Sequence, residues 1–184
     1  MAYGYRLNVE QVMLAAADRH WELAIREMWE VRDEDVETAK PFTFIAPQTD
    51  DGLIAAVQAV IGWAVCLEAL ANLAWNQSKG TDAPRNLSTV KKLIELTEGA
   101  QSDRNWLEEI RQLFDLRNYL VHYKEVIEYV GFSFAPPYLK RFEKTKMERY
   151  RKALTAAALD LGAAAGVSVD FVKGGRPKVV YLQG

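Results

Sequence analysis

The chain has 184 residues, of which 49% are hydrophobic, so it can bury one sizeable core and is not a disordered protein. Its 23 basic and 25 acidic side chains give a formal charge of -2, which offers no overall support for nucleic-acid binding. One cysteine excludes a disulfide framework and a cluster of zinc-binding thiols. The first residues lack the pattern of a secretory signal. We expect a cytoplasmic protein that needs no metal and no cofactor.

Apolar residues at helical spacing predict a long first helix from residue 8 to about residue 38. The segment 40–52 contains two prolines and ends in glycine, so it predicts a turn. Asp50 or Asp51 would then cap a second helix.

The second predicted helix is the most apolar part of the chain. Residues 53–75 are long and apolar enough to cross a membrane. An acidic side chain and two amides interrupt the run: Gln58, Glu68 and Asn72. Such groups are costly in lipid but are tolerated in a core where they find partners. We therefore expect a buried core helix and no membrane contact, with Trp63 and Trp75 packed in the core and not stacked on bases.

Two shorter helices are predicted next. The third covers about 87–98, with Ser88 as its cap and with Lys91 and Lys92 on its outer face. The fourth begins at residue 102 or 103 and continues to about residue 130, before Gly131 and a pair of prolines.

The last third of the chain changes character. A basic fifth helix is expected over about 138–165, and its charges either attract RNA or only solvate one face. The β-branched and aromatic runs 167–172 and 178–182 predict a terminal hairpin. The expected fold is all-α, an up-and-down bundle of about five helices with a short C-terminal β-hairpin. Residues 1–166 form the bundle, and 167–184 are a hairpin or tail of the same domain.

The fourth predicted helix carries the most informative segment, 116–123, which reads LRNYLVHY. At about 100° per residue a polar stripe forms on this helix from Arg111, Asp115, Asn118, His122 and Glu125. Arg117 projects from the adjoining apolar arc, where a permanently charged guanidinium needs an acceptor. A guanidinium can neutralise phosphate oxygens, and an imidazole can transfer protons near neutral pH. Together they supply the parts of a metal-free phosphate site.

Glu68 is the expected partner of Arg117. It is the acidic residue of the second helix after the cap, and Asn72 follows it one turn later on the same face. The pair has two interpretations. It is either a core ion pair that fixes the register of two helices, or Glu68 orients Arg117 toward a phosphate at the edge of the bundle.

The histidines also allow two interpretations. An isolated histidine is usually a surface or partly buried residue without a chemical task. His122 has Asn118 one turn before it and Arg117 on the adjoining face, which favours a functional role. His20 lies beside Trp21 in the first helix, has no comparable setting, and is interpreted as structural.

The two segments 67–72 (LEALAN) and 116–123 together form a pattern: an acidic, Ala-rich apolar helix, then Arg-Asn, an apolar run and His-Tyr late on another helix. This pattern resembles the HEPN family, the higher eukaryotes and prokaryotes nucleotide-binding domains, and it covers most of residues 50–130. The resemblance implies a metal-independent endoribonuclease in which the 2′-hydroxyl of RNA attacks the adjacent phosphorus and leaves a 2′,3′-cyclic phosphate.

The resemblance also implies a role for each motif residue. His122 would transfer protons, and Arg117 would neutralise charge on the phosphorane. Asn118 would bind a phosphate oxygen or orient the imidazole. Tyr123 would either assist or serve only as a packing aromatic. Glu68 and Asn72 would support the site from the second helix.

The implied partners follow from the family. RNA or a nucleotide is the expected ligand, and a homodimer through the motif helix would bring two histidines to one phosphate. Family members include toxins and defence effectors held inactive by an antitoxin-like partner protein. Others bind a nucleotide or a partner protein without cleaving anything. A non-catalytic module of that kind, or a purely structural bundle, therefore stays open beside the nuclease.

Overall fold

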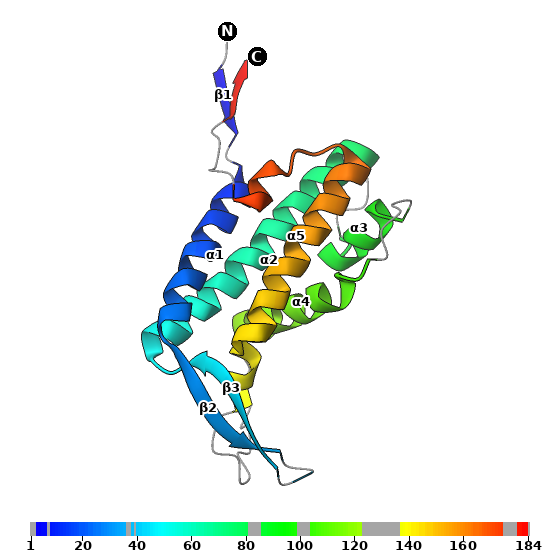
Figure 1. Ribbon diagram of the computed structural model, residues 1–184. Helices are drawn as coiled ribbons and strands as arrows, with labels where there is room; N and C mark the ends of the chain where they lie inside the picture. Colours follow the sequence, from blue (N-terminus) through cyan, green and yellow to red (C-terminus); the bar gives the residue numbers. More distant parts are fainter. Residues whose placement is uncertain are drawn as a thin grey trace.

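The computed structural model describes residues 3–6, 8–35, 38, 40–80, 86–98, 104–122, 137–174 and 180–183. The described residues form a mostly helical bundle with two small antiparallel sheets (Figure 1). The elements, in chain order, are β1 (Tyr3–Arg6), α1 (Val9–Arg26), β2 (Met28–Glu34), β3 (Pro41–Pro47), α2 (Asp50–Lys79), α3 (Thr89–Leu96), α4 (Leu107–Val121), the 3-10 helix η1 (Pro137–Phe142), α5 (Lys144–Ala165), the 3-10 helix η2 (Asp170–Lys173) and β4 (Val180–Gln183). The predicted helical bundle is confirmed.

Helix α2 is the centre of the bundle and contacts α1, α3, α4 and α5. The side chain of the N-cap residue Thr49 caps the first turn by accepting a hydrogen bond of 3.0 Å from the backbone N–H of Gly52. The predicted cap at Asp50 or Asp51 is therefore one or two residues too late. Among the described helices, α2 alone is long and apolar enough to cross a membrane, but 56% of its most apolar window is buried within the molecule. The predicted core helix is confirmed, and both Trp63 and Trp75 are buried.

Helix α1 packs closely along α2. Gly62 makes this approach possible, because a Cβ at that position would lie 2.8 Å from the Cβ of Ala17. The buried face of α1 repeats at helical intervals: Glu10, Leu14, Ala17, Trp21 and Ala24. Val12 and Leu23 share the helical spacing of apolar residues but are exposed. The spacing therefore predicts the helix but not which of its apolar residues are buried.

The predicted first helix is too long. It ends at Arg26, and residues 28–34 form strand β2, which pairs with β3 in the register Met28↔Pro47 to Glu34↔Pro41. The segment 40–52 was predicted as a turn, but its first part is that second strand. The local sequence did not reveal these strands, because each strand pairs its backbone N–H and C=O groups with the other strand.

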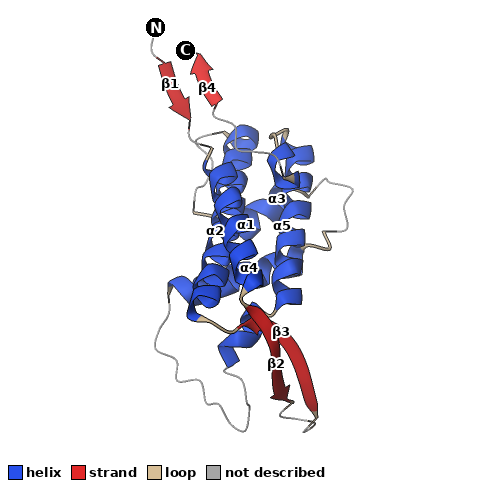
Figure 2. Ribbon diagram, turned by 60° about the vertical axis from the view of Figure 1, so that its left-hand side comes forward, coloured by secondary structure: helices blue, strands red, loops and turns tan. Residues whose placement is uncertain are grey.

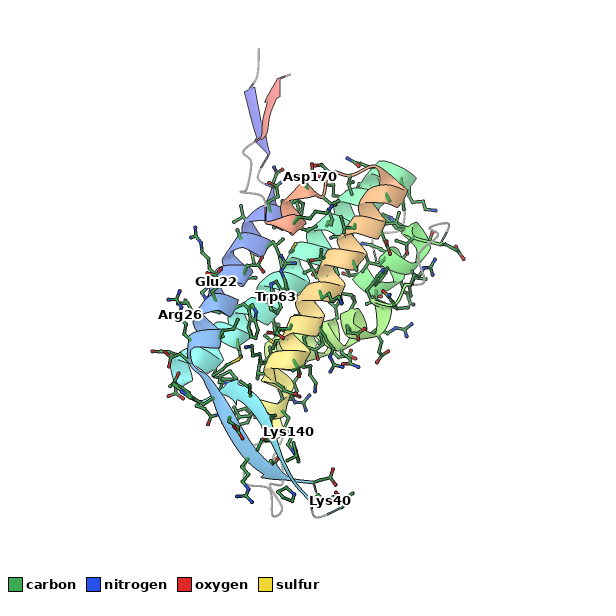
Figure 3. All side chains as sticks on the ribbon, in the orientation of Figure 1. Glu22, Arg26, Lys40, Trp63, Lys140 and Asp170 are labelled. Carbon is green, nitrogen blue, oxygen red and sulfur yellow. The ribbon has the colours of Figure 1, made fainter. Side chains whose placement is uncertain are left out.

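The β2–β3 hairpin projects from one end of the bundle, whereas β1 and β4 project from the other end (Figures 1 and 2). Phe44 and Ala46 of the hairpin pack against Leu139 of η1. The Nζ of Lys140, labelled in Figure 3, lies 2.5 Å from a carboxylate oxygen of the buried Asp33, which pairs with Phe42 near the turn end of the hairpin. The hairpin is thereby fixed to the start of the α5 region.

The predicted C-terminal hairpin is wrong. Residues 170–173 form a 3-10 helix, and Phe171 and Val172 are buried against the bundle. Strand β4 pairs with the N-terminal strand β1, from Tyr3↔Gln183 to Arg6↔Val180. The apolar run at 167–172 was therefore a core-packing segment, and the strand partner came from the other end of the chain.

A polar network crosses the core between α1, α2 and α5. Arg151 donates to both carboxylate oxygens of Asp18, at 2.7 and 2.9 Å, and Trp63 Nε1 donates to the same carboxylate at 2.9 Å. Arg151 also donates to the hydroxyl of Thr155 and to the backbone carbonyl of Val172. This guanidinium of the basic fifth helix thus serves a structural role, and Figure 3 shows Trp63 inside the bundle.

Candidate functional site

A cavity of about 830 Å³ lies between α2, α3 and α4. Helix α2 contributes Glu68, Asn72, Trp75 and Asn76 to its wall. Asn72 follows Glu68 by four residues, and Trp75 and Asn76 follow Asn72 by three and four, so they share one face of the helix. This side of α2 is turned toward the gap between α3 and α4, which both pack on α2.

Helix α3 closes the second side of the cavity. It begins after Ser88, whose Oγ accepts a hydrogen bond of 3.4 Å from the backbone N–H of Lys91, as predicted. Thr89, Val90 and Lys92 line the cavity together with Ser88 and Leu87.

Lys92 does not lie on the outer face of α3 as predicted. Lys91 is exposed, but Lys92 is 6% exposed, and its Nζ donates a hydrogen bond of 2.7 Å to the Oδ1 of Asn72. Burying an ammonium is costly unless it has acceptors, and Asn72 supplies one. A cation is thereby held in the wall of the cavity.

Helix α4 forms the third side. It covers Leu107–Val121, and the predicted start at residue 102 or 103 lies outside the described residues. Buried Ile110, Leu113 and Leu116 fix it to the core. Arg141 lies over the ring of Tyr119, 4.2 Å from its centroid, and steadies the C-terminal half of the helix.

The motif residues Arg117 and Asn118 are both in the cavity wall. The Nη1 of Arg117 donates a hydrogen bond of 3.0 Å to the Oδ1 of Asn118, which holds the guanidinium beside the amide. The Nε of Arg117 is buried and has no acceptor among the described residues. Part of the hydrogen-bonding capacity of the guanidinium is therefore unused among the described residues.

Glu68 and Arg117 line the same cavity, but the described residues show no ion pair between them within 4.0 Å. The core ion pair, one of the two interpretations of these residues, is therefore absent from the described part of the chain. Asn72, the second supporting residue predicted on α2, is committed to Lys92. The structure thus brings four of the predicted site residues to one cavity without pairing the two charged ones.

His122 lies at the end of α4. It caps the helix with φ -109° and ψ 29°, and its backbone N–H donates to the carbonyl of Asn118 at 2.9 Å. The fourth helix was predicted to continue to about residue 130, but α4 ends at Val121. The side chain of His122 is exposed and is not among the residues that line the cavity. Tyr123 and Glu125 lie outside the described residues.

The exposed stripe on α4 is partly described. Arg111, Asp115, Asn118 and His122 are all exposed in the single chain, and the first three also line the cavity. The cavity and the stripe are therefore one continuous polar surface, with His122 at its far end.

The charges of the cavity favour an anion. Three cationic side chains, Lys92, Arg111 and Arg117, face two carboxylates, Glu68 and Asp115. In the described part of the chain, no group of three or more His, Cys, Asp or Glu side chains is arranged to hold a metal ion. The arrangement can bind a phosphate group through guanidinium, ammonium and amide groups.

Sequence reasoning missed Trp75, Asn76 and Lys92 as parts of this surface. Asn76 could have been predicted from the sequence, because it follows Asn72 by four residues, just as Asn72 follows Glu68. Lys92 was not, because only the packing of α3 on α2 turns it inward. Comparison with models of known protein families, with curated proteins and with solved structures found no match.

Proposed function

We propose that this protein is a metal-independent endoribonuclease of the HEPN type. The observation that carries the proposal is the arrangement of Arg117, Asn118 and His122. The first two are hydrogen-bonded at the wall of a cationic cavity, and the third is an exposed imidazole one turn later on the same helix. The guanidinium of Arg117 has no carboxylate within 4.0 Å among the described residues, and a guanidinium in that state can attract a phosphate.

In the proposed reaction the 2′-hydroxyl of RNA attacks the adjacent phosphorus. His122 takes the hydroxyl proton, Arg117 neutralises the charge that develops on the equatorial phosphate oxygens, and Asn118 donates a hydrogen bond through its free amide N–H groups. The bond to the 5′-oxygen breaks, and that oxygen receives a proton from a general acid. The products are a 2′,3′-cyclic phosphate and a 5′-hydroxyl, so water is not the nucleophile.

A homodimer supplies the general acid in this proposal. The polar stripe of α4 is exposed in the single chain, so it is free to face the same stripe of a second copy. The partner subunit's His122 would then protonate the leaving oxygen while the first His122 acts as base. Such an enzyme is suited to a role as a toxin or defence effector that an antitoxin-like protein holds inactive.

The test is cleavage of RNA in excess EDTA by the wild type, His122→Ala and His20→Ala. His20 is the other histidine of the chain and lies on α1, outside the cavity. The proposal expects wild type and His20→Ala to cut and His122→Ala to lose at least about a hundredfold in rate, the usual contribution of general acid–base catalysis. Equal rates for all three proteins would overturn it, provided that all three melt at the same temperature.

A second candidate is a non-catalytic HEPN-like module that binds a nucleotide or a partner protein. The position of His122, outside the cavity lining, favours it, because binding in the cavity needs no imidazole. Such a module would show a ligand-dependent rise in melting temperature without turnover of RNA.

A further inference from the structure

Two buried donors in the wall of the cavity have no acceptor among the described residues. They are the Nε1–H of Trp75, a residue only 3% exposed, and the Nε–H of Arg117. By contrast, the Nε1–H groups of Trp63 and Trp106 each donate to a carboxylate. Buried N–H groups in proteins are almost always paired, so unpaired ones beside a cavity point to a ligand that brings acceptors.

The N-terminus of α3 faces the same cavity. Ser88, Thr89 and Val90 line it, and the cap side chain of Ser88 accepts only the N–H of Lys91. The N–H groups of Thr89 and Val90 have no acceptor in the helix because they belong to its first turn. The aligned peptide dipoles add partial positive charge there, which makes a helix N-terminus a binding site for phosphate.

The charge and size of the cavity limit the kinds of ligand that it can bind. Lys92 and Arg117 supply full positive charges beside these N–H groups. The volume of about 830 Å³ is far larger than a lone phosphate needs and suits a molecule of nucleotide size. The amides of Asn76 and Asn118 and the ring of Phe114 offer contacts for a base and a sugar.

We propose that the cavity binds a nucleotide unit with its phosphate group at the N-terminus of α3, where Lys92 and Trp75 supply further donors. The inference rests on the proposed function in one respect: we take the bound nucleotide to be part of an RNA chain, next to the bond that is cleaved. This phosphate is then a second anchor, distinct from the one that His122 acts on. A free mononucleotide has the same chemistry, and the test separates the two sources.

The test is calorimetric titration in EDTA with adenosine 5′-monophosphate, adenosine and inorganic phosphate. The monophosphate should bind at least about tenfold more tightly than adenosine, because only it brings the anion. Trp75→Phe and Lys92→Met should each weaken its binding by about tenfold, the value of one hydrogen bond to a charged group. Trp29→Phe and Lys91→Met, which change exposed residues of the same types, should leave it unchanged.

Equal binding of adenosine and its monophosphate, or no binding of either, would overturn the inference. Unchanged affinity in a folded Trp75→Phe variant would also overturn it. That substitution keeps an aromatic ring and removes the N–H, so it tests the site even if Lys92→Met does not fold.

The source of the phosphate is tested by competition with a 2′-O-methyl RNA tetranucleotide, which cannot be cleaved. Displacement of the tetranucleotide by adenosine 5′-monophosphate supports a shared RNA site, whereas simultaneous binding of both overturns the link with RNA. His122→Ala should bind the monophosphate like the wild type. Absence of RNA cleavage by the wild type together with intact nucleotide binding would therefore defeat the proposed nuclease alone, and cleavage by the wild type without nucleotide binding would defeat this inference alone.

Discussion

The ammonium of Lys92 donates a hydrogen bond of 2.7 Å to the Oδ1 of Asn72, and this contact ties α3 to α2 at the cavity that both residues line. Lys92 is 6% exposed, whereas its neighbour Lys91 is exposed to solvent. A cation is therefore held in the cavity wall by a hydrogen bond to an uncharged amide. This arrangement adds positive charge to the cavity, which favours an anionic ligand.

The Lys92–Asn72 contact should contribute to stability. Asn72→Ala removes an acceptor from a buried ammonium, so we expect the free energy of unfolding to fall by about 1–3 kcal/mol. Asn76→Ala, one turn later at an exposed position of the same helix, should change it by less than about 0.5 kcal/mol. Urea unfolding followed by circular dichroism measures both. Equal stability of the two variants would mean that the contact is not formed in solution.

Arg151 and Arg117 are both partly buried, but replacing them by methionine should affect the free energy of unfolding differently. Arg151→Met leaves the carboxylate of Asp18 without its paired charge, so we expect a loss of about 2–4 kcal/mol in the free energy of unfolding. Arg117→Met removes a guanidinium that has no ion pair among the described residues and whose Nε lacks an acceptor, so the loss should stay below about 1 kcal/mol.

Urea unfolding of the two arginine variants side by side decides between the two interpretations of Arg117. Stability retained with RNA cleavage lost is the result that a functional Arg117 requires. If Arg117→Met were as unstable as Arg151→Met, Arg117 would be a core ion-pair residue.

Cys66 makes the stability of the protein sensitive to high pH. Burial raises the pKa of its thiol to about 12, against the opposing effect of the Arg151 charge. In the unfolded chain the thiol loses its proton from about pH 8.5. The folded state therefore holds this proton more tightly, and its contribution to stability is complete below about pH 8.5 and is lost as the pH rises toward 12.

The pH effect is measured by urea unfolding of wild type and Cys66→Ala at pH 8 and pH 10. The wild type should lose up to about 1.4 kcal/mol more than the variant for each pH unit above 8.5. Comparing the two proteins removes the contributions of other titrating groups. Rapid modification of the native thiol by a thiol reagent at pH 8 would contradict the buried, protonated state.

The sequence allowed the bundle to be predicted where the helical pattern was unambiguous, as in α2 and α3. The prediction failed at residues 28–34, which form a strand. Met28 and Val31 continue the helical spacing, whereas the alternate positions Trp29, Val31 and Asp33 also fit a strand. Only pairing with β3 decides between the two periods, and pairing between β1 and β4 joins opposite ends of the chain. Long-range contacts of this kind leave no local signal.

The candidate site was predictable in the same uneven way. Glu68, Asn72, Arg117 and Asn118 were singled out because polar side chains on apolar helices need partners, and the structure brings all four to one cavity. Lys92 and Trp75 look locally like a surface lysine and a core tryptophan. Their role in the cavity wall depends on how α3 docks on α2, which their own segments do not encode.

The measurement that tests the proposed reaction most directly is cleavage in EDTA of an RNA oligonucleotide and of a matched oligonucleotide with a single 2′-O-methyl group at the cut position. If the 2′-hydroxyl is the nucleophile, the unmodified RNA is cut to a 2′,3′-cyclic phosphate and a 5′-hydroxyl, and the modified position is not cut. Cleavage of both oligonucleotides at the same rate, or products with a 5′-phosphate, would contradict the account.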